Sequence, residues 1–404
     1  MRAGTAFRSF FSRTSVSALI VLFALASPLL LIRPGLSDDA PLTVRGVIPN
    51  VARDEASPLH LNQIQVVGTH NSYHLQLRPA AFALLQQAAP KEAMEWEFSH
   101  APLDQQLTAG IRQIELDAYA DPAGGLYANP LGLRLIGENP PGGIPELLAP
   151  GFKVLHTQDI DFETNCFTLV SCLTVVRTWS DAHPGHLPVV IMIEAKEEPL
   201  PEDVIDPALG IVTPLPIGAA EFDALDAEIL SVFSRSRIIE PDDIRGDEAT
   251  VDAGVQANGW PTLDEARGKV LFVLDNREKR ADYLAGHPAL EGRVMFTDSR
   301  PGEEDGAFLI LNNPIAQSAE IRAAVTSGYL VRTRADENTV EARSGDVARR
   351  DAAFSSGAQF ISTDFPWYAP AVWTGYSVEL PGGAATICNV VVVPLGCPYD
   401  PVIP

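Results

Sequence analysis

Short runs of apolar and β-branched residues alternate along the chain with segments of helical periodicity. Compact apolar runs between Gly, Pro and polar clusters predict strands, and apolar positions repeating every three or four residues predict helices. We expect eight strands, in residues 63–68, 111–116, 152–155, 188–194, 269–274, 293–297, 328–333 and 358–363. Helical patterns such as "AEFDALDAEILSVF" and "SAEIRAAVTSG" separate these runs.

Strands that alternate with helices favour a parallel sheet in an α/β fold. Eight strand–helix units fit a closed TIM-type (β/α)8 barrel in a single domain. A doubly wound open sheet is the alternative, but it calls for a Gly-rich phosphate loop after the first strand. "GTHNSYH", residues 68–74, is not such a loop.

Three regions are expected along the chain. In residues 1–40, Arg2, Arg8 and Arg13 precede an apolar run and then small residues, which is the order of an export signal. An uncleaved membrane anchor is the alternative, because the apolar run is nearly long enough to span a bilayer. Residues 41–380 form the barrel, and residues 381–404 form a tail that packs on its outside. Two Gly- and Pro-rich insertions, residues 120–150 and 199–219, are predicted to be irregular loops.

The chain is strongly acidic, with 29 basic and 52 acidic residues and a formal charge of −23. This balance argues against nucleic acid as a partner, because phosphates are neutralised by basic surfaces. It also argues against tight electrostatic adhesion to anionic membranes. Some of the carboxylates are therefore candidates for holding a cation.

The four cysteines form two close pairs, Cys166 with Cys172 and Cys388 with Cys397. In an exported chain this pattern predicts two local disulfides. Zinc is the competing interpretation, but neither pair has C-x-x-C spacing and no histidine partners lie nearby.

Polar residues gather where the first four predicted strands end. The catalytic groups of a parallel barrel lie at the carboxyl ends of its strands, so these residues are predicted to meet on one rim. They are His70, Asn71, Glu115, Asp117, His156, Glu194 and Lys196. Glu115 and Asp117 point to the same side because strand side chains alternate. Buried charges at such positions are costly unless they are paired or hold a metal.

Asn71, Glu115, Asp117 and Glu194 form an all-oxygen set. Such ligands suit a hard divalent cation, calcium first and magnesium second. Zinc would recruit the two histidines as well. His70 and His156 beside a cation suit phosphodiester cleavage, in which one imidazole removes a proton and the other supplies one. The alternative is that both are hydrogen-bonded core histidines.

"GTHNSYH", "HAPLDQQLTAGIRQIELDAYAD", "KVLHTQ" and "LPVVIMIEAKE" resemble the catalytic segment of phosphatidylinositol-specific phospholipase C, most of all its secreted bacterial calcium-dependent branch. The resemblance implies a TIM-type barrel and covers residues 60–200 most clearly. It implies that His70 assists attack by the inositol 2-hydroxyl and that His156 protonates the diacylglycerol oxygen. It also implies that the all-oxygen set binds calcium and that a cyclic inositol phosphodiester forms. The long insertion between Glu115 and His156 departs from the compact animal enzymes.

Further candidates follow from the barrel. Lys196 is a candidate phosphate contact, or else a rim lysine paired with Glu194 or Glu198. Arg332 and Arg334 are candidates for holding ring phosphates or hydroxyls, or else are surface residues.

Asp364 ends the last predicted strand, in "STDFP". Closure of a barrel brings its last strand beside its first. Asp364 is therefore a candidate for orienting His70, and its place on the rim also makes it a candidate substrate contact.

We accordingly expect an exported, calcium-dependent phosphodiesterase that acts as a monomer on a phospholipid at a membrane surface. One rival is a glycerophosphodiester phosphodiesterase, whose usual opening is His-Arg-Gly and not the His-Asn found here. The other is a catalytically silent barrel that binds a headgroup. The presence of all six proposed catalytic and metal-binding residues disfavours this second rival.

Overall fold

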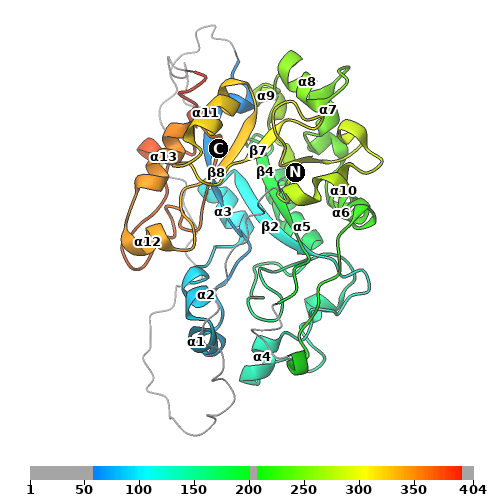
Figure 1. Cartoon of the computed structure of the whole chain (residues 1–404), viewed down its shortest axis with the longest axis vertical. Helices are drawn as coiled ribbons and strands as arrows, with labels where there is room; N and C mark the ends of the chain where they lie inside the picture. The colour runs from blue at the N-terminus through cyan, green and yellow to red at the C-terminus, as the bar shows by residue number, and fades with distance from the viewer. Residues whose placement is uncertain (1–57, 201–206, 394–404) are drawn as a thin grey trace, which may run out of the picture.

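Eight parallel strands form the centre of the molecule in a computed structural model that describes residues 58–200 and 207–393 (Figure 1). They are β1 (Ile64–Thr69), β2 (Gln113–Tyr119), β4 (Val189–Lys196), β5 (Val270–Leu274), β6 (Met295–Thr297), β7 (Phe308–Ile310), β8 (Leu330–Arg334) and β9 (Phe360–Thr363). Their neighbour order is β6-β5-β4-β2-β1-β9-β8-β7. A parallel bridge between Asp298 and Phe308 joins the two ends of this row. The sheet is thus a nearly closed (β/α)8 barrel, as the sequence predicts.

One predicted barrel strand is wrong and one was missed. Residues 152–155 contain β3 (Lys153–Val154), which pairs antiparallel with the end of β2, outside the barrel. The sixth barrel strand is β7, in the apolar stretch "AFLIL" that the prediction passed over. Both errors have one cause, since short apolar runs carry no sign of whether they pair inside a barrel or beside it.

Helices surround the strands and fill the loops at their carboxyl ends. They are α1 (Pro79–Ala88), α2 (Pro90–Glu95), α3 (Leu103–Ala109), α4 (Leu131–Ile136), α5 (Leu169–Ala182), α6 (Ala219–Val232), α7 (Pro241–Arg245), α8 (Val251–Ala257), α9 (Leu263–Ala266), α10 (Arg280–Leu284), α11 (Ser318–Thr326), α12 (Val340–Ser344) and α13 (Ala348–Ser356). Figure 1 shows α11 and α13 on one side of the strands and α5, α6 and α10 on the other. Thr168 is the N-cap of α5, and its hydroxyl accepts the Ser171 N–H at 3.1 Å, a favourable cap.

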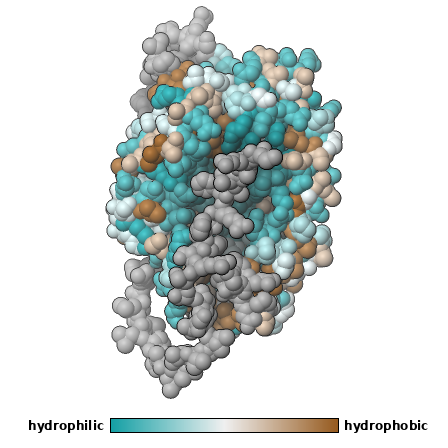
Figure 2. Space-filling model, viewed as in Figure 1, coloured by the Kyte–Doolittle hydropathy of each residue, from teal (hydrophilic) through white to brown (hydrophobic). Residues whose placement is uncertain are grey.

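The main core is the barrel and its helices. β5 is buried along its whole length and β4 along most of it, as expected for parallel strands covered on both faces. On the surface in Figure 2, hydrophobic residues are scattered among hydrophilic ones.

A second, smaller core lies beyond the carboxyl ends of the strands, among α1, α2, α4 and the insertion of residues 120–150. Its members include Leu77, Phe82, Leu85, Leu133, Ile144, Leu147, Leu155 and Phe162. The insertion is therefore folded around apolar side chains of its own and supports the segment that carries His156.

The tail takes part in the sheet. β10 (Thr386–Cys388) pairs antiparallel with the start of β1, placing Cys388 opposite Ile64.

Cys166 and Cys172 form a disulfide, as predicted. The second predicted pair stays a prediction because Cys397 lies outside the described residues, as does the expected export signal in residues 1–40. Within the described ranges, no helix is long and apolar enough to cross a membrane.

Candidate active site

A tight turn at the end of β1 presents His70 and Asn71 to the rim. Asn71 has a positive φ of 44°, a left-handed conformation that Asn adopts more readily than most residues. Ser72 fastens the turn to β2, because its N–H donates to the Glu115 carbonyl at 3.0 Å and its hydroxyl accepts the Glu115 N–H at 2.8 Å. The turn thereby brings Asn71 beside the carboxylates of β2.

Three carboxylates meet at the carboxyl ends of β2 and β4. Asp117 and Glu194 are direct partners in the parallel register of these strands. One oxygen from each of Glu115, Asp117 and Glu194 lies within 4.8 Å of the other two. Oxygens bound to one calcium ion at about 2.4 Å are at most about 4.8 Å apart, so this spacing fits a shared cation.

Two of the predicted metal ligands carry polar atoms that lack hydrogen bonds. Both carboxylate oxygens of Asp117, and Oδ1 of Asn71, are buried with no hydrogen-bond partner among the described residues. Burial, followed by the charge of Glu194, raises the pKa of Asp117 well above its ordinary value. Buried acceptors without hydrogen bonds are costly, and a divalent cation would satisfy them together. The residues present therefore fit a calcium ion.

Basic residues border the carboxylates. Nζ of Lys196 is 3.1 Å from a Glu194 oxygen and 3.5 Å from an Asp117 oxygen. Burial would lower the pKa of Lys196, but Asp117 and Glu194 hold it well above its usual value. The guanidinium of Arg332 donates to Glu115 and, at 2.8 Å, to the side-chain oxygen of Asn312.

The other oxygen of Glu115 faces His70, at 3.7 Å from Nε2. Arg332 is fully buried, and its described contacts are with protein side chains. Whether it also contacts substrate stays a prediction.

His70 is held by Asp364, the residue that ends the last barrel strand. Nδ1 of His70 is 2.8 Å from Asp364 Oδ1, and Arg334 donates to the other Asp364 oxygen at 3.2 Å. Burial would raise the pKa of Asp364, but His70 and Arg334 hold it well below its usual value. The carboxylate thus accepts the Nδ1–H of His70, which leaves the Nε2 lone pair facing the rim. Arg334 lies 3.3 Å from Nε2.

His156 reaches the rim by a different route from the predicted one. It follows β3, which lies outside the barrel, and therefore sits on the inserted segment and not at a barrel strand end. Its Nδ1 is 2.8 Å from Asp161, and its ring packs edge-on against Trp96. Burial lowers the pKa of His156, and Asp161 opposes this shift.

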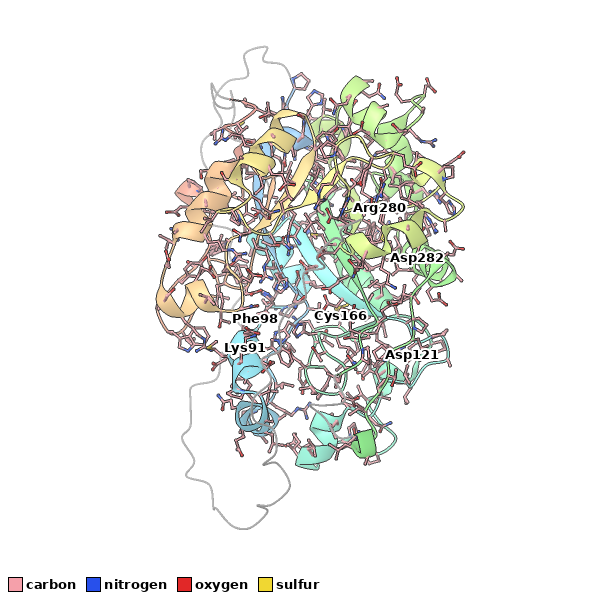
Figure 3. The ribbon with its side chains drawn as sticks, in the orientation of Figure 1. Lys91, Phe98, Asp121, Cys166, Arg280 and Asp282 are labelled. Atoms are coloured by element: carbon pink, nitrogen blue, oxygen red, sulfur yellow. A yellow bond between two sulfur atoms is a disulfide. The ribbon has the colours of Figure 1, made fainter. Side chains whose placement is uncertain are left out.

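The two imidazoles flank the carboxylates. Burial would raise the pKa of Glu194, but Lys196 and the charges of both His70 and His156 lower it. Phe98 packs against His74, with ring centroids 4.4 Å apart, and lies 6.5 Å from His70. In Figure 3, Phe98 and Cys166 lie between the strands and the helices α1, α2 and α4. Two imidazoles, three carboxylates and a lysine thus share one rim, an arrangement suited to acid–base chemistry on an anionic substrate.

The sequence reasoning missed several rim residues. Asp275 directly follows β5. Burial, and next the negative charge of Glu115, raise the pKa of Asp275 well above its ordinary value. The strand-end rule, applied to the fifth strand as to the first four, would have found it. His100, whose Nε2 is 2.8 Å from the His70 carbonyl, and Asp161 lie on irregular segments without a periodic signal.

Comparisons with known proteins identify the family of the chain. A family model described as Ca2+-dependent phosphoinositide phospholipase C matches residues 59–390. No curated protein matches the chain.

Solved structures resemble the chain at low sequence identity. A calcium-dependent phosphoinositol-specific phospholipase C from a Pseudomonas species is 16% identical, with a TM-score of 0.49, over 81% of this chain and 95% of that one. A Ca2+-dependent phosphatidylinositol-specific phospholipase C from Streptomyces antibioticus is 19% identical, with a TM-score of 0.47, over 76% and 95%.

Proposed function

This chain belongs to the Ca2+-dependent phosphoinositide phospholipase C family, and from that premise we propose how its barrel acts. It is a calcium-dependent phosphodiesterase that cleaves phosphatidylinositol-type lipids. We assign the base to His70, the acid to His156 and the cation site to Asn71, Glu115, Asp117 and Glu194.

One observation carries this assignment. Each imidazole has its Nδ1 2.8 Å from a buried carboxylate, Asp364 for His70 and Asp161 for His156. In both rings Nε2 is then the nitrogen that exchanges a proton with substrate. Two rings fixed in this way on either side of a carboxylate cluster suit paired acid and base catalysis.

The proposed reaction needs one proton removed and one supplied. Nε2 of His70 takes the proton of the inositol 2-hydroxyl, whose oxygen forms a bond to phosphorus. The bond from phosphorus to the diacylglycerol oxygen breaks, and that oxygen takes a proton from Nε2 of His156. The products are diacylglycerol and a cyclic inositol phosphate, since a neighbouring hydroxyl reaches phosphorus with little loss of entropy.

Positive charge at the rim suits the phosphate. Calcium held by the four oxygen ligands would withdraw charge from the phosphoryl oxygens. Lys196 already borders these ligands. Arg334 lies 3.3 Å from His70 Nε2, where it can contact a substrate oxygen that is hydrogen-bonded to that nitrogen. We therefore propose Lys196 and Arg334 as phosphate or hydroxyl contacts.

We also propose that the rim meets the membrane and that the protein works outside the cytoplasm as a monomer. Several large hydrophobic side chains are exposed on the segments that follow the strand ends: Leu84, Met94, Leu135, Leu148 and Leu209. These side chains can enter the lipid surface by hydrophobic contact, which does not depend on electrostatic attraction between the acidic protein and the membrane. The Cys166–Cys172 disulfide supports an oxidising compartment.

Substrate competition tests the assignment. Purified protein is given phosphatidylinositol vesicles, glycerophosphoinositol and glycerophosphocholine, each with calcium, and the water-soluble phosphates are identified. We expect release of inositol phosphates from the vesicles with little cleavage of the other two. Preferential cleavage of glycerophosphocholine would contradict the proposal and favour a glycerophosphodiesterase.

A further inference from the structure

A single carboxylate oxygen joins two histidines beside the proposed acid. Oδ2 of Asp161 is 2.8 Å from Nδ1 of His156 and 2.9 Å from Nε2 of His74. Asp161 and His74 are both fully buried. The mechanism above uses Asp161 only as the partner of His156 Nδ1 and gives His74 no role, although His74 closes the "GTHNSYH" motif.

The backbone builds this arrangement from two directions. A narrow hairpin turns the chain back after His156, with paired backbone hydrogen bonds of 2.9 Å between Thr157 and Asp161. Asp159 stands in the turn with a positive φ of 67° and accepts the Leu131 N–H at 2.9 Å, which ties the hairpin to α4. The carboxylate of Asp161 is therefore held in a fixed place.

His74 comes from the segment that carries the base. Its N–H donates to the Asn71 carbonyl at 2.8 Å, and it pairs as an antiparallel bridge with Thr164 on the acid's segment. Its ring lies against Phe98 at 4.4 Å between centroids. His74 is thus part of the turn after β1 and reaches the acid's carboxylate through its side chain.

The hydrogen positions follow from the chemistry of the groups. Burial would raise the pKa of Asp161, but His74 and His156 hold it well below its usual value, so it only accepts hydrogen bonds. Both ring nitrogens that face it must then carry a proton. His74 keeps a bare Nδ1, which is buried without a hydrogen-bond partner in the described part of the chain. The contact of Nε2 with Asp161 at 2.9 Å fixes the orientation of the His74 ring.

We propose that His74 and Asp161 are positioning residues for the acid, acting as a His74–Asp161–His156 chain. Asp161 fixes the ring of His156 and stabilises its protonated form. His74 donates to Oδ2 of Asp161 and so keeps that oxygen in position to accept the Nδ1–H of His156. The same three residues are close enough to hold a metal ion. However, His74 Nε2 and His156 Nδ1 already form hydrogen bonds with Asp161 Oδ2. This inference rests on the assignment of His156 as the acid.

Leaving-group dependence tests the proposal. Phosphatidylinositol in mixed micelles has an alkoxide leaving group that needs a proton, whereas a p-nitrophenyl ester of inositol phosphate releases a phenolate that does not. The full chain is compared with H156A, D161N, H74F and H74Q, with kcat measured on both substrates and thermal unfolding recorded for each variant. H74F retains a ring to pack on Phe98 but cannot donate, whereas the side-chain amide of H74Q can.

We expect D161N to lose about 10²-fold or more in kcat on the lipid, within the usual range for acid catalysis, and less than about tenfold on the aryl ester. H74F should lose about tenfold on the lipid and little on the aryl ester. H74Q should recover most of that loss. This split between substrates would not arise from a merely structural role.

The outcomes separate this inference from the proposed function. If H156A loses activity selectively on the lipid but D161N and H74F lose none, or lose it equally on both substrates, the positioning chain is wrong and the acid assignment stands. If H156A loses activity equally on both substrates, the acid assignment itself fails. Failure of H74Q to exceed H74F would also overturn the role of His74.

Discussion

Replacing Asp364 with Asn separates orientation of the base from overall stability. The carboxylate accepts the Nδ1–H of His70 at 2.8 Å and an N–H of Arg334 at 3.2 Å. An Asn amide has nearly the same shape but can present N–H to Nδ1. His70 would then carry its proton on Nε2, the nitrogen that we propose takes the substrate's proton.

The expected loss is large in kcat and small in KM. An Asp-to-Asn change that traps the wrong imidazole tautomer lowers kcat by on the order of 10³- to 10⁴-fold. That corresponds to about 4–5.5 kcal/mol of activation free energy. KM should change little, because Asp364 is buried behind His70. The free energy of unfolding should fall by about 1–3 kcal/mol, because Arg334 loses a charged partner.

Steady-state kinetics on the micellar lipid and urea denaturation measure these two effects. A matched control is D351N, which makes the same substitution at an exposed position on α13 where Asp351 pairs with Arg350. The control should retain wild-type kcat and stability. If D364N kept more than a tenth of wild-type kcat, or changed KM alone, the orientation of His70 by Asp364 would be refuted.

Three further changes have expected outcomes. D117N should abolish the rise in melting temperature that calcium produces, which for wild type at 100 times Kd corresponds to about 2.7 kcal/mol of stability. It should also stabilise the calcium-free protein, because it removes a buried carboxylate with a raised pKa. A normal calcium-induced rise in the melting temperature of D117N would contradict the ligand assignment. Burial, then the charge of Asp364, raises the pKa of Asp336 to about 7, so the stability it contributes is present below its unfolded pKa of about 4 and is lost as pH rises through 7. Urea denaturation between pH 4 and 8 should show a smaller fall in stability for D336N than for wild type, and equal falls would count against this. Removing the Cys166–Cys172 disulfide with C166S/C172S should lower the free energy of unfolding by roughly 2 kcal/mol, and an unchanged denaturation midpoint would show that the loop is held by its other contacts.

The part of the site that lies on barrel strands was predictable from the sequence. Alternation along β2 places Glu115 and Asp117 on one face, and parallel strands end on one rim. His70, Asn71 and Glu194 follow by the same rule. The contact between Asp364 and His70 follows from closure of the barrel, because the last strand lies beside the first.

The acid side of the site lies beyond this rule. His156 was assigned to a barrel strand, whereas β3 pairs outside the barrel and the small core of the insertion supports it. The link from His156 through Asp161 to His74 depends on a hairpin in a loop with no periodic pattern. Burial of Arg332 against Glu115 depends on side-chain packing across the barrel, which strand periodicity does not specify.

The most direct test is the release of inositol phosphates from phosphatidylinositol vesicles by wild type and H156A, with calcium present and with a chelator. We predict release by wild type that requires calcium, and a loss of at least about 10²-fold in H156A with calcium present. Release that continued in chelator would contradict the cation site formed by Asn71, Glu115, Asp117 and Glu194. Undiminished release by H156A would contradict its assignment as the acid.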